Sequence, residues 1–528
     1  KVLLRHTLPH QWCSGTCSES ESRTWKLREA MSDGFVTVGQ CIEGLPIGIF
    51  VWEMLLCAFM GIFWLGALNE PTPFALGIIS TDWAYSELTV NAVLAAMSVG
   101  NAVSLVLAGW LADRYGRARM IRHQLFATMA VAVFIQGEKT FRQTLWSRFL
   151  LGVSSGGLLA AIIPLVSEML PARNRGFYLT VWCCGRPAGA LFAVIVGCIL
   201  PHLEWTSFVL MMMVPAVILY VLCRLDVMPE SPRFLYLVGE REEGFYTLLE
   251  IYDKEMMCLP WGPESVSLTT SSEDLSDTKA GMETLPRSDA AVTALLCLTV
   301  FFADCASQCM KAWVPLTNMG AQPNPLALIA FPFLQVHSQQ GLALLQGTPD
   351  RHQVMIVAQG YMLEICGVIF CAAISTVLSR RWLIRIALFL AACLSFASVF
   401  AERHSLWFTA GPLYGAALVA QSAAFNFLLV YTCEKFPTAT RASAVGLVLF
   451  FGQVAKLFMP AMGILLLRRM SEFAVVLTFN SLYLIACALA FQLPLPAYRE
   501  RSLHDIDEKG GRDSQRTRKR LGVTYQTV

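Results

Sequence analysis

Two short stretches of this chain carry a glutamate and an arginine at identical spacing. "VSEMLPARNRGFY" holds Glu168 and Arg175, "VYTCEKFPTATRASAVG" holds Glu434 and Arg441, and the two copies are 266 residues apart. A proline in each stretch marks the end of one helix before the next begins. The glutamate then lies at the C-terminal end of a helix and the arginine at the N-terminal start of the next, and each is repelled by its own helix dipole. All four side chains therefore need opposite charges from elsewhere in the fold, and ion pairing is the chemistry indicated.

The rest of the chain is too apolar for a soluble protein. Of its 528 residues, 55% are hydrophobic and 15% are charged, whereas a soluble protein is about one quarter charged. A formal net charge of +2 provides no basic footprint for nucleic acid. About twelve apolar stretches approach the roughly 20 residues that cross a bilayer, and they centre near Phe59, Val103, Val131, Leu158, Leu191, Met213, Leu298, Val368, Leu390, Leu418, Leu457 and Leu484.

The basic residues indicate how these stretches are oriented. The loops after the second, fourth, eighth and tenth stretches are richest in arginine and lysine, so the positive-inside rule predicts that they and both termini are cytosolic. The predicted organisation is an N-terminal cytosolic segment 1–47, a six-helix bundle 48–225, a polar cytosolic linker 226–288, a second six-helix bundle 289–498 and a C-terminal cytosolic tail 499–528.

Several motifs resemble those of one transporter family. "GWLADRYGR" from Gly109 resembles the signature of the loop between helices 2 and 3 in the major facilitator superfamily, and "PESPRFL" from Pro229 resembles a signature of its sugar and organic-ion carriers. "YTCEKFPTATR" is most similar to the synaptic-vesicle-2-related and organic-ion transporter branch. The resemblance implies an all-α membrane protein with twelve transmembrane helices in two six-helix bundles.

The resemblance also assigns a role to the charged loop residues. Members of this family use them as a cytoplasmic gate that holds one state and breaks when the inner side opens. The alternative is a set of solvated surface pairs worth about 0–1 kcal/mol each, and the repetition in both halves favours the gate. The matching positions are Asp113, Arg114, Arg117, Glu168, Arg175, Glu230, Arg233, Glu434 and Arg441.

Polar residues inside the apolar stretches are candidates for a solute site, because a charge at membrane depth is costly and usually faces a cavity or a partner. Asp304, Gln308 and Lys311 lie on one face of the predicted helix around Leu298. Alternatively, Asp304 and Lys311 form a buried structural pair, or Lys311 extends outward to the membrane surface, since Pro315 marks a helix end nearby. The other candidates are Glu364, Glu70, Arg186, Gln453 and Lys456.

Two further positions stay open. Glu70 lies within the membrane if its helix runs to Ser80, or at the outer edge if Pro71 ends the helix. Arg148 resembles an arginine of the family's fourth helix, or it anchors the helix at the membrane interface.

These features favour a secondary transporter of a small organic solute, such as an organic ion, a vitamin-like acid or a sugar. Its two halves would rock around a central site. Asp304 and Glu364 are candidates for proton coupling, and facilitated diffusion is the alternative. The rival function is a transporter-like receptor or nutrient sensor. We expect no enzymatic activity, since phosphate-binding and nucleophile motifs are absent from the sequence. We also expect no metal, cofactor or nucleic-acid partner, and a monomer surrounded by lipid of the plasma membrane or a vesicle membrane.

Overall fold

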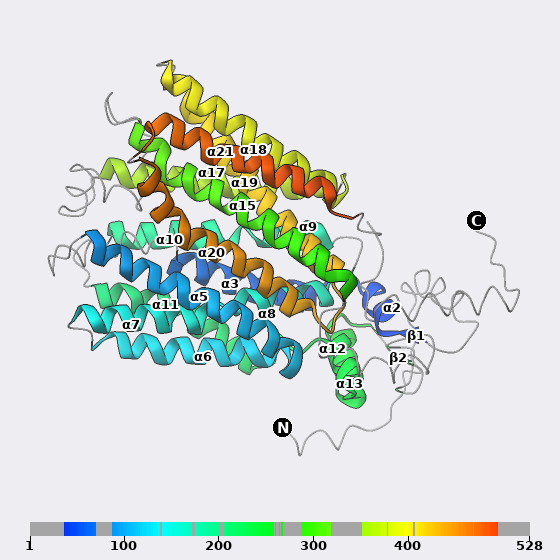
Figure 1. Cartoon of the computed structure of the whole chain (residues 1–528). Coiled ribbons are helices and arrows are strands. Elements are labelled where there is room, and N and C mark those ends of the chain that lie inside the picture. Colours follow the sequence, from blue (N-terminus) through cyan, green and yellow to red (C-terminus); the bar gives the residue numbers. More distant parts are fainter. Residues whose placement is uncertain are drawn as a thin grey trace, which may run out of the picture.

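The computed structural model is described for residues 36–69, 87–137, 140–171, 175–199, 205–257, 287–317, 351–376, 378–404, 407–467 and 469–494, together with a few positions near residue 266. Nearly all of this part is helical (Figure 1). The first half contains α3 (Ile49–Asn69), α5 (Glu87–Tyr115), α6 (Arg117–Ile135), α7 (Phe141–Ser155), α8 (Leu158–Met169), α9 (Arg175–Trp182), α10 (Gly185–Ile199) and α11 (Trp205–Arg224). The second half contains α15 (Arg287–Thr317), α17 (Arg351–Ser375), α18 (Arg380–Arg403), α19 (Trp407–Lys435), α20 (Arg441–Leu467) and α21 (Glu472–Gln492).

Every predicted apolar stretch has its centre in one of these helices. Among the described residues, ten spans are long and apolar enough to cross a membrane. The other two predicted positions are occupied by α6, which begins with several arginines, and by α17, whose apolar part is Tyr361–Ser375. The all-α prediction is confirmed, and membrane crossing by α6 and α17 stays a prediction.

Two of the spans are broken near their middle. The span Phe141–Met169 changes from α7 to α8 at Gly156 and Gly157, where adjacent glycines weaken the helix. The span Arg175–Val196 changes from α9 to α10 at Cys183 and Cys184. Pro187 explains this second break, because it has no N–H to donate to the carbonyl four residues earlier.

The two halves have separate apolar cores that meet at one end. The first core also takes in residues of the second half, among them Val368, Val430 and Val445. Most other core residues of the second half form a second cluster. α5 packs along α20, and glycines allow the close approach: a Cβ at Gly109 would lie 2.6 Å from the Ala442 carbonyl oxygen, and one at Gly446 would overlap the Leu105 carbonyl.

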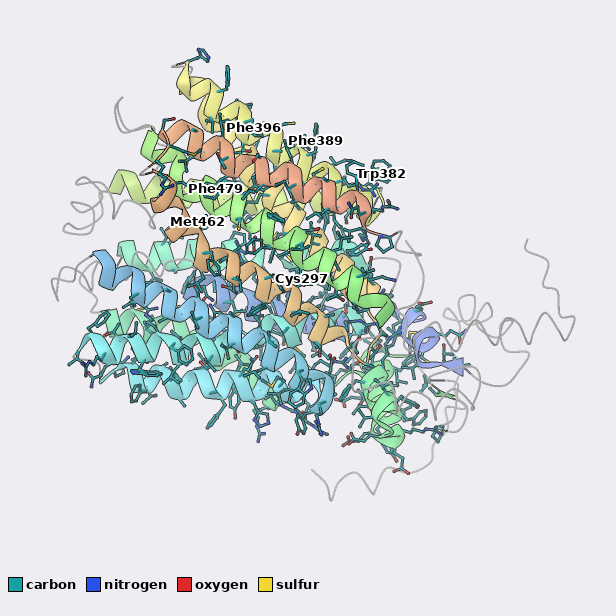
Figure 2. The ribbon with its side chains drawn as sticks, in the orientation of Figure 1. Cys297, Trp382, Phe389, Phe396, Met462 and Phe479 are labelled. Atoms are coloured by element: carbon teal, nitrogen blue, oxygen red, sulfur yellow. The ribbon has the colours of Figure 1, made fainter. Side chains whose placement is uncertain are left out.

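The outer surface is apolar in the way that a bilayer requires. Figure 2 shows Trp382 and Phe389 pointing outward from α18, and their side chains are 53% and 54% exposed. Many other large apolar side chains of the described helices are exposed in the same way, including Phe126, Val133, Trp146 and Phe370.

Part of the predicted linker is folded. It forms α12 (Pro232–Val238), α13 (Arg241–Lys254) and β2 (Val266–Ser267), which gather at one end of the bundle with β1 (Val36–Thr37) and α2 (Val38–Glu43) (Figure 1). Pro232, Phe234 and Leu248 are buried there. The charged and polar residues of this stretch predict only a polar linker. The apolar side chains that intervene between its charges explain the difference, because they are enough to pack two short helices. The rest of this predicted linker lies largely outside the described residues.

Candidate functional site

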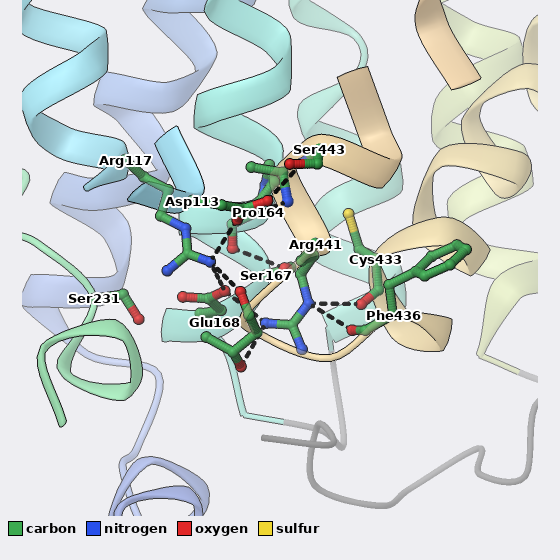
Figure 3. A network of polar contacts seen from close by, with 12 residues as sticks. Asp113, Arg117, Pro164, Ser167, Glu168, Ser231, Cys433, Phe436, Arg441 and Ser443 are labelled. Carbon is green, nitrogen blue, oxygen red and sulfur yellow. Dashed lines mark hydrogen bonds and ion pairs between the residues drawn. The ribbon is translucent and has the colours of Figure 1, made fainter. Parts of the chain in front are cut away.

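The ends of α8 and α20 meet through a buried ion pair. Glu168 is in the last turn of α8, Arg441 is the first residue of α20, and Arg441 Nη1 lies 2.6 Å from Glu168 Oε1 (Figure 3). Both side chains are fully buried. Arg441 Nε also donates to the carbonyls of Cys433 and Phe436, at 3.0 and 3.1 Å. Glu168 and Arg441, each at an unfavourable end of its own helix, thus receive the opposite charge that they need from the other half.

Arg117 extends this pair into a network. Its Nη2 lies 3.1 Å from Asp113 Oδ1 and 3.2 Å from Glu168 Oε1, and it donates to the Thr438 carbonyl (Figure 3). Thr438 comes from the loop between α19 and α20, so Arg117 binds both halves at once. The guanidinium also lies over the Phe234 ring, 4.6 Å from its centroid.

Asp113 binds the beginning of α20 directly. Its Oδ1 accepts from Ala442 N at 3.1 Å, and its Oδ2 accepts from Ser443 N at 2.7 Å. The first N–H groups of a helix have no partner within the helix, and the helix dipole favours a negative charge there. Asp113 therefore satisfies two donors of α20 and offsets the unfavourable position of Arg441.

Glu230 plays the same part at the beginning of α6. It accepts from Arg117 N at 2.9 Å and from Ala118 N at 3.0 Å. Burial raises the pKa of the Glu230 carboxyl above its usual range, while the nearby Arg117 guanidinium and the N–H groups of Arg117 and Ser231 act in the opposite direction. The segment just after α11 is thereby tied to the same arginine as Asp113 and Glu168.

The second copy of the motif forms a smaller cluster. Arg380 Nε lies 3.6 Å from Glu434 Oε1, and Arg380 Nη1 donates to the Ser375 carbonyl at 2.7 Å. Glu434 also attracts the buried guanidinium of Arg175 electrostatically. Glu168 therefore contacts the repeat arginine of the other half, whereas Glu434 contacts Arg380 of its own half and acts on Arg175 only through electrostatic attraction.

The predicted gate set needs two adjustments. Arg114 lies outside the network: its side chain is exposed, and its guanidinium is 5.5 Å from the Trp110 ring centroid. Arg380 was not among the predicted gate residues, although it follows Arg114 by the repeat offset of 266 residues. Arg233 is fully buried beneath α2.

Some partners in the network are backbone groups, such as the Thr438 carbonyl and the Ser443 N–H. The sequence could not indicate these partners, because nearly every residue has the same backbone groups.

Several predicted solute-site residues lie deeper in the bundle. Arg186 of α10 is half-buried, and its guanidinium carbon lies 6.0 Å from the centroid of Phe425, a residue of α19 in the other half. Glu364 of α17 is half-buried and accepts from Ser422 Oγ of α19 at 2.8 Å. The Asp304 carboxylate lies against Gly452 of α20, where a Cβ would overlap it.

The remaining candidates are placed less fully. Gln453 and Lys456 of α20 are half-buried, and Lys456 shares a helix face with Gly452. Gln308 and Lys311 belong to α15, which continues past Pro315 to Thr317, but their side chains lie outside the described residues. Glu70 also lies outside them, directly after the last described residue of α3.

A polar chain that the predictions omitted crosses the second half. Gln421 of α19 donates to Ser307 Oγ of α15, and Tyr483 of α21 donates to Gln421 Oε1 at 2.8 Å. The available signal was the pair Gln421 and Ser422, two adjacent polar residues within an apolar stretch.

The deeper polar residues lie at one level. Arg186 and Glu364, and Gly452 against which the Asp304 carboxylate lies, are each eleven residues from a helix end on the network side, at Arg175, Ser375 and Arg441 respectively. At 1.5 Å per residue, this separation is about 16 Å, roughly half the thickness of a bilayer core. The geometry is therefore a charged network at one end of the bundle and a polar layer near its middle.

Comparison with known proteins identifies the family. A model of the Major Facilitator Superfamily matches residues 51–335, more than half of the chain. The chain belongs to the major facilitator superfamily. The predicted family is confirmed, and the prediction of a solute transporter is confirmed at the level of the family.

Two relatives of this major facilitator superfamily protein align with most of its length. It is 24% identical over 434 residues to the benzoate transport protein of Acinetobacter baylyi, covering 80% of this chain and 85% of that protein. It is 24% identical over 473 residues to the synaptic vesicle 2-related protein of Rattus norvegicus, covering 88% and 82%. The proton:xylose symporter XylE of E. coli has the same fold, with a TM-score of 0.62 and 16% identity over 84% of this chain and 96% of that one.

Proposed function

We propose that this protein is a secondary transporter that moves a small organic solute across a membrane by alternating access of its two halves. The observation that carries this proposal is the buried pair of Arg441 and Glu168, which joins the halves at one end, about 16 Å from a polar layer near the bundle's middle. Transporters bind their solutes near the bilayer midplane, between their repeats. Charges at that depth are costly unless they serve a ligand or a partner.

The solute class that the layer fits best is an organic acid. The guanidinium of Arg186 matches a carboxylate in shape and charge, and Phe425 offers a ring face beside it. A benzoate transport protein among the relatives supports this choice. Arg186 would bind the carboxylate from one half, while Phe425 and the hydrogen-bonded pair of Glu364 and Ser422 would contact the solute from the other.

The network at the end of the bundle would serve as the cytoplasmic gate. Its members are Asp113, Arg117, Glu168, Arg175, Glu230, Arg380, Glu434 and Arg441, with the termini and this end of the bundle cytosolic by the positive-inside rule. When the gate opens, each buried charge would exchange its partner for water, so that the closed and open states remain close in free energy. The membrane would be the plasma membrane or that of an intracellular vesicle.

Uptake into proteoliposomes tests the proposal directly. Purified protein would be reconstituted and supplied with labelled benzoate or xylose, with and without an imposed proton gradient. We expect benzoate uptake that falls at least about tenfold in Arg186→Gln, because the carboxylate loses a charge-assisted hydrogen bond worth about 1.5–3 kcal/mol. Arg142→Gln, which changes an exposed arginine at the start of α7, is the matched control and should transport normally.

Two results would contradict the proposal. Uptake of xylose but not benzoate would contradict the proposal that the solute is an organic acid. A protein whose unfolding temperature rises with benzoate, but which moves neither solute, would be a receptor rather than a transporter, because a ligand stabilises the folded state whether or not it is transported.

A further inference from the structure

The amino-terminal residues 36–45, called the strap below, lie against the folded part of the linker. The strap contains β1 and α2, and its apolar side chains are packed away from solvent: Val36, Val38, Cys41, Ile42 and Leu45 are all buried. A capping box between Thr37 and Gln40 starts its short helix, with each side chain accepting from the other's backbone N–H. The strap is thus an ordered element with its own apolar contacts.

Two contacts hold the strap to α13 and β2 of the folded linker. β1 pairs in parallel with β2, so that Val36 is opposite Val266 and Thr37 is opposite Ser267. Tyr252 of α13 donates its hydroxyl to the Cys41 carbonyl at 2.8 Å. These contacts span more than 200 residues of sequence, so the strap closes a small cap at the end of the bundle.

The strap also covers Arg233 of α12. A Cβ at Gly39 would lie 3.3 Å from Arg233 Nη2, so α2 rests directly on this guanidinium. Arg233 is fully buried. The next residue, Phe234, lies over Arg117 at 4.6 Å, and Glu230, just before α12, accepts from Arg117 N and Ala118 N. The position of α12 therefore decides whether the Phe234 ring and the Glu230 carboxylate can both contact Arg117.

The cap belongs to the first half of the protein. Glu255, at the end of α13, accepts from Phe50 N at 2.9 Å and from Val51 N at 3.4 Å, which are N–H groups at the beginning of α3. Lys254 Nζ lies 3.9 Å from Glu53 Oε2, and Glu53 also belongs to α3. Because these contacts are to the first half alone, the cap can move with that half when the gate opens.

We propose that the strap is a positioning element for the gate. By resting on Arg233 and pairing with β2, it holds α12 where Glu230 and Phe234 fix Arg117, and Arg117 then reaches Glu168 and the Thr438 carbonyl in the other half. The consequence for transport rests on the proposed gate, but the positioning itself does not. Its test therefore needs no solute.

Hydrogen–deuterium exchange of the full chain, read by mass spectrometry in detergent, measures the positioning. The reporter is the start of α6, because the N–H groups of Arg117 and Ala118 are satisfied by Glu230 rather than by their own helix. Gly39→Leu would force a side chain into the Arg233 guanidinium, and Val36→Asp would place a charge where the native side chain is 3% exposed. Gly137→Leu is the control, since a Cβ there meets only the Phe134 carbonyl at an ordinary 3.6 Å.

We expect both strap variants to raise exchange in residues 36–45 and to raise it about tenfold at the start of α6, while α15 and α18 keep their protection. The control variant should match the native protein throughout. A strap released in either variant, with native exchange at the start of α6, would overturn the proposal. Native exchange in residues 36–45 of both variants would also overturn the proposal, because the packing of Gly39 and Val36 would then not be what holds the strap in place.

Discussion

Arg441 of α20 and Glu168 of α8 form a fully buried ion pair across the two halves, with 2.6 Å between Nη1 and Oε1. The cost of removing both charges from water offsets much of their attraction, so such a pair adds little net stability. Leaving either charge buried alone is costly, whereas returning both to water is not. The pair therefore favours two arrangements, closed and dry or open and wet, and disfavours those between them.

Removing one partner of this pair should be costly. Glu168→Gln leaves Arg441 and Arg117 buried without their shared carboxylate, and we expect a loss of about 3–5 kcal/mol in the free energy of unfolding. Glu434→Gln is the comparison, because its partner Arg380 is 3.6 Å away and its side chain is 13% exposed. Its loss should be smaller, about 1 kcal/mol. Chemical denaturation of both variants in detergent measures this, and equal losses would contradict the assignment.

Glu434→Gln should nevertheless change the conformational equilibrium. Its carboxylate attracts Arg175 of the first half and contacts Arg380, whose guanidinium lies against Gly176 of the first half. Loss of this charge therefore weakens the attraction between the halves and favours the state open at this end. Single cysteines introduced at either end of the bundle, labelled with a membrane-impermeant maleimide, report the balance. Labelling should rise at the network end and fall at the other, and identical labelling in native and variant protein would exclude a gating role.

Gly116 should tolerate no side chain. Its φ of 107° lies in a region that residues with a Cβ rarely adopt, and a Cβ there would overlap Glu230 Oε2. We expect Gly116→Ala to lower the free energy of unfolding by about 1–3 kcal/mol. Gly137→Ala, in open surroundings, should change it little. A Gly116→Ala protein as stable as the native one would show that the Glu230 contact is dispensable.

Glu230 should make stability depend on pH. Burial raises the pKa of its carboxyl in the folded protein above the value of 4.5 in the unfolded chain. The folded state then binds more protons than the unfolded state between these two pKa values, so stability is greatest below the unfolded value and falls as pH rises through the folded one. Unfolding measured from pH 4 to pH 8 should show a larger loss in the native protein than in Glu230→Gln. A larger loss in the variant would reverse the sign and contradict the burial argument.

Asp304 allows coupling and binding to be separated. If it carries a proton, Asp304→Asn should abolish solute accumulation driven by a pH gradient and leave solute exchange intact, because the amide cannot titrate. If it binds the solute, both activities should be lost. Accumulation and counterflow assays on the same proteoliposomes distinguish these cases. Native accumulation that ignores an imposed proton gradient would rule out proton coupling altogether.

The sequence by itself determined which segments are helices and which charges need partners. The recurring apolar stretches predicted the helical spans, because only a closed hydrogen-bonding pattern is tolerated in hydrocarbon. The repeated offset of 266 residues pointed to Glu168, Arg175, Glu434 and Arg441. Their positions at unfavourable helix ends required opposite charges. These are local properties, so they can be inferred from residue types and spacing alone.

Only the tertiary structure decided which partners meet. Glu168 could have been paired with either arginine of the repeat, and it lies beside Arg441, 273 residues away. Arg114 is an arginine of the same motif as Arg117, but its side chain is exposed and lies beside Trp110. Neither the contact of the strap with Arg233 nor its pairing with β2 had a signature in the sequence. Pairing across such distances depends on how whole helices pack, and that packing results from many weak contacts in both halves, not from any one motif.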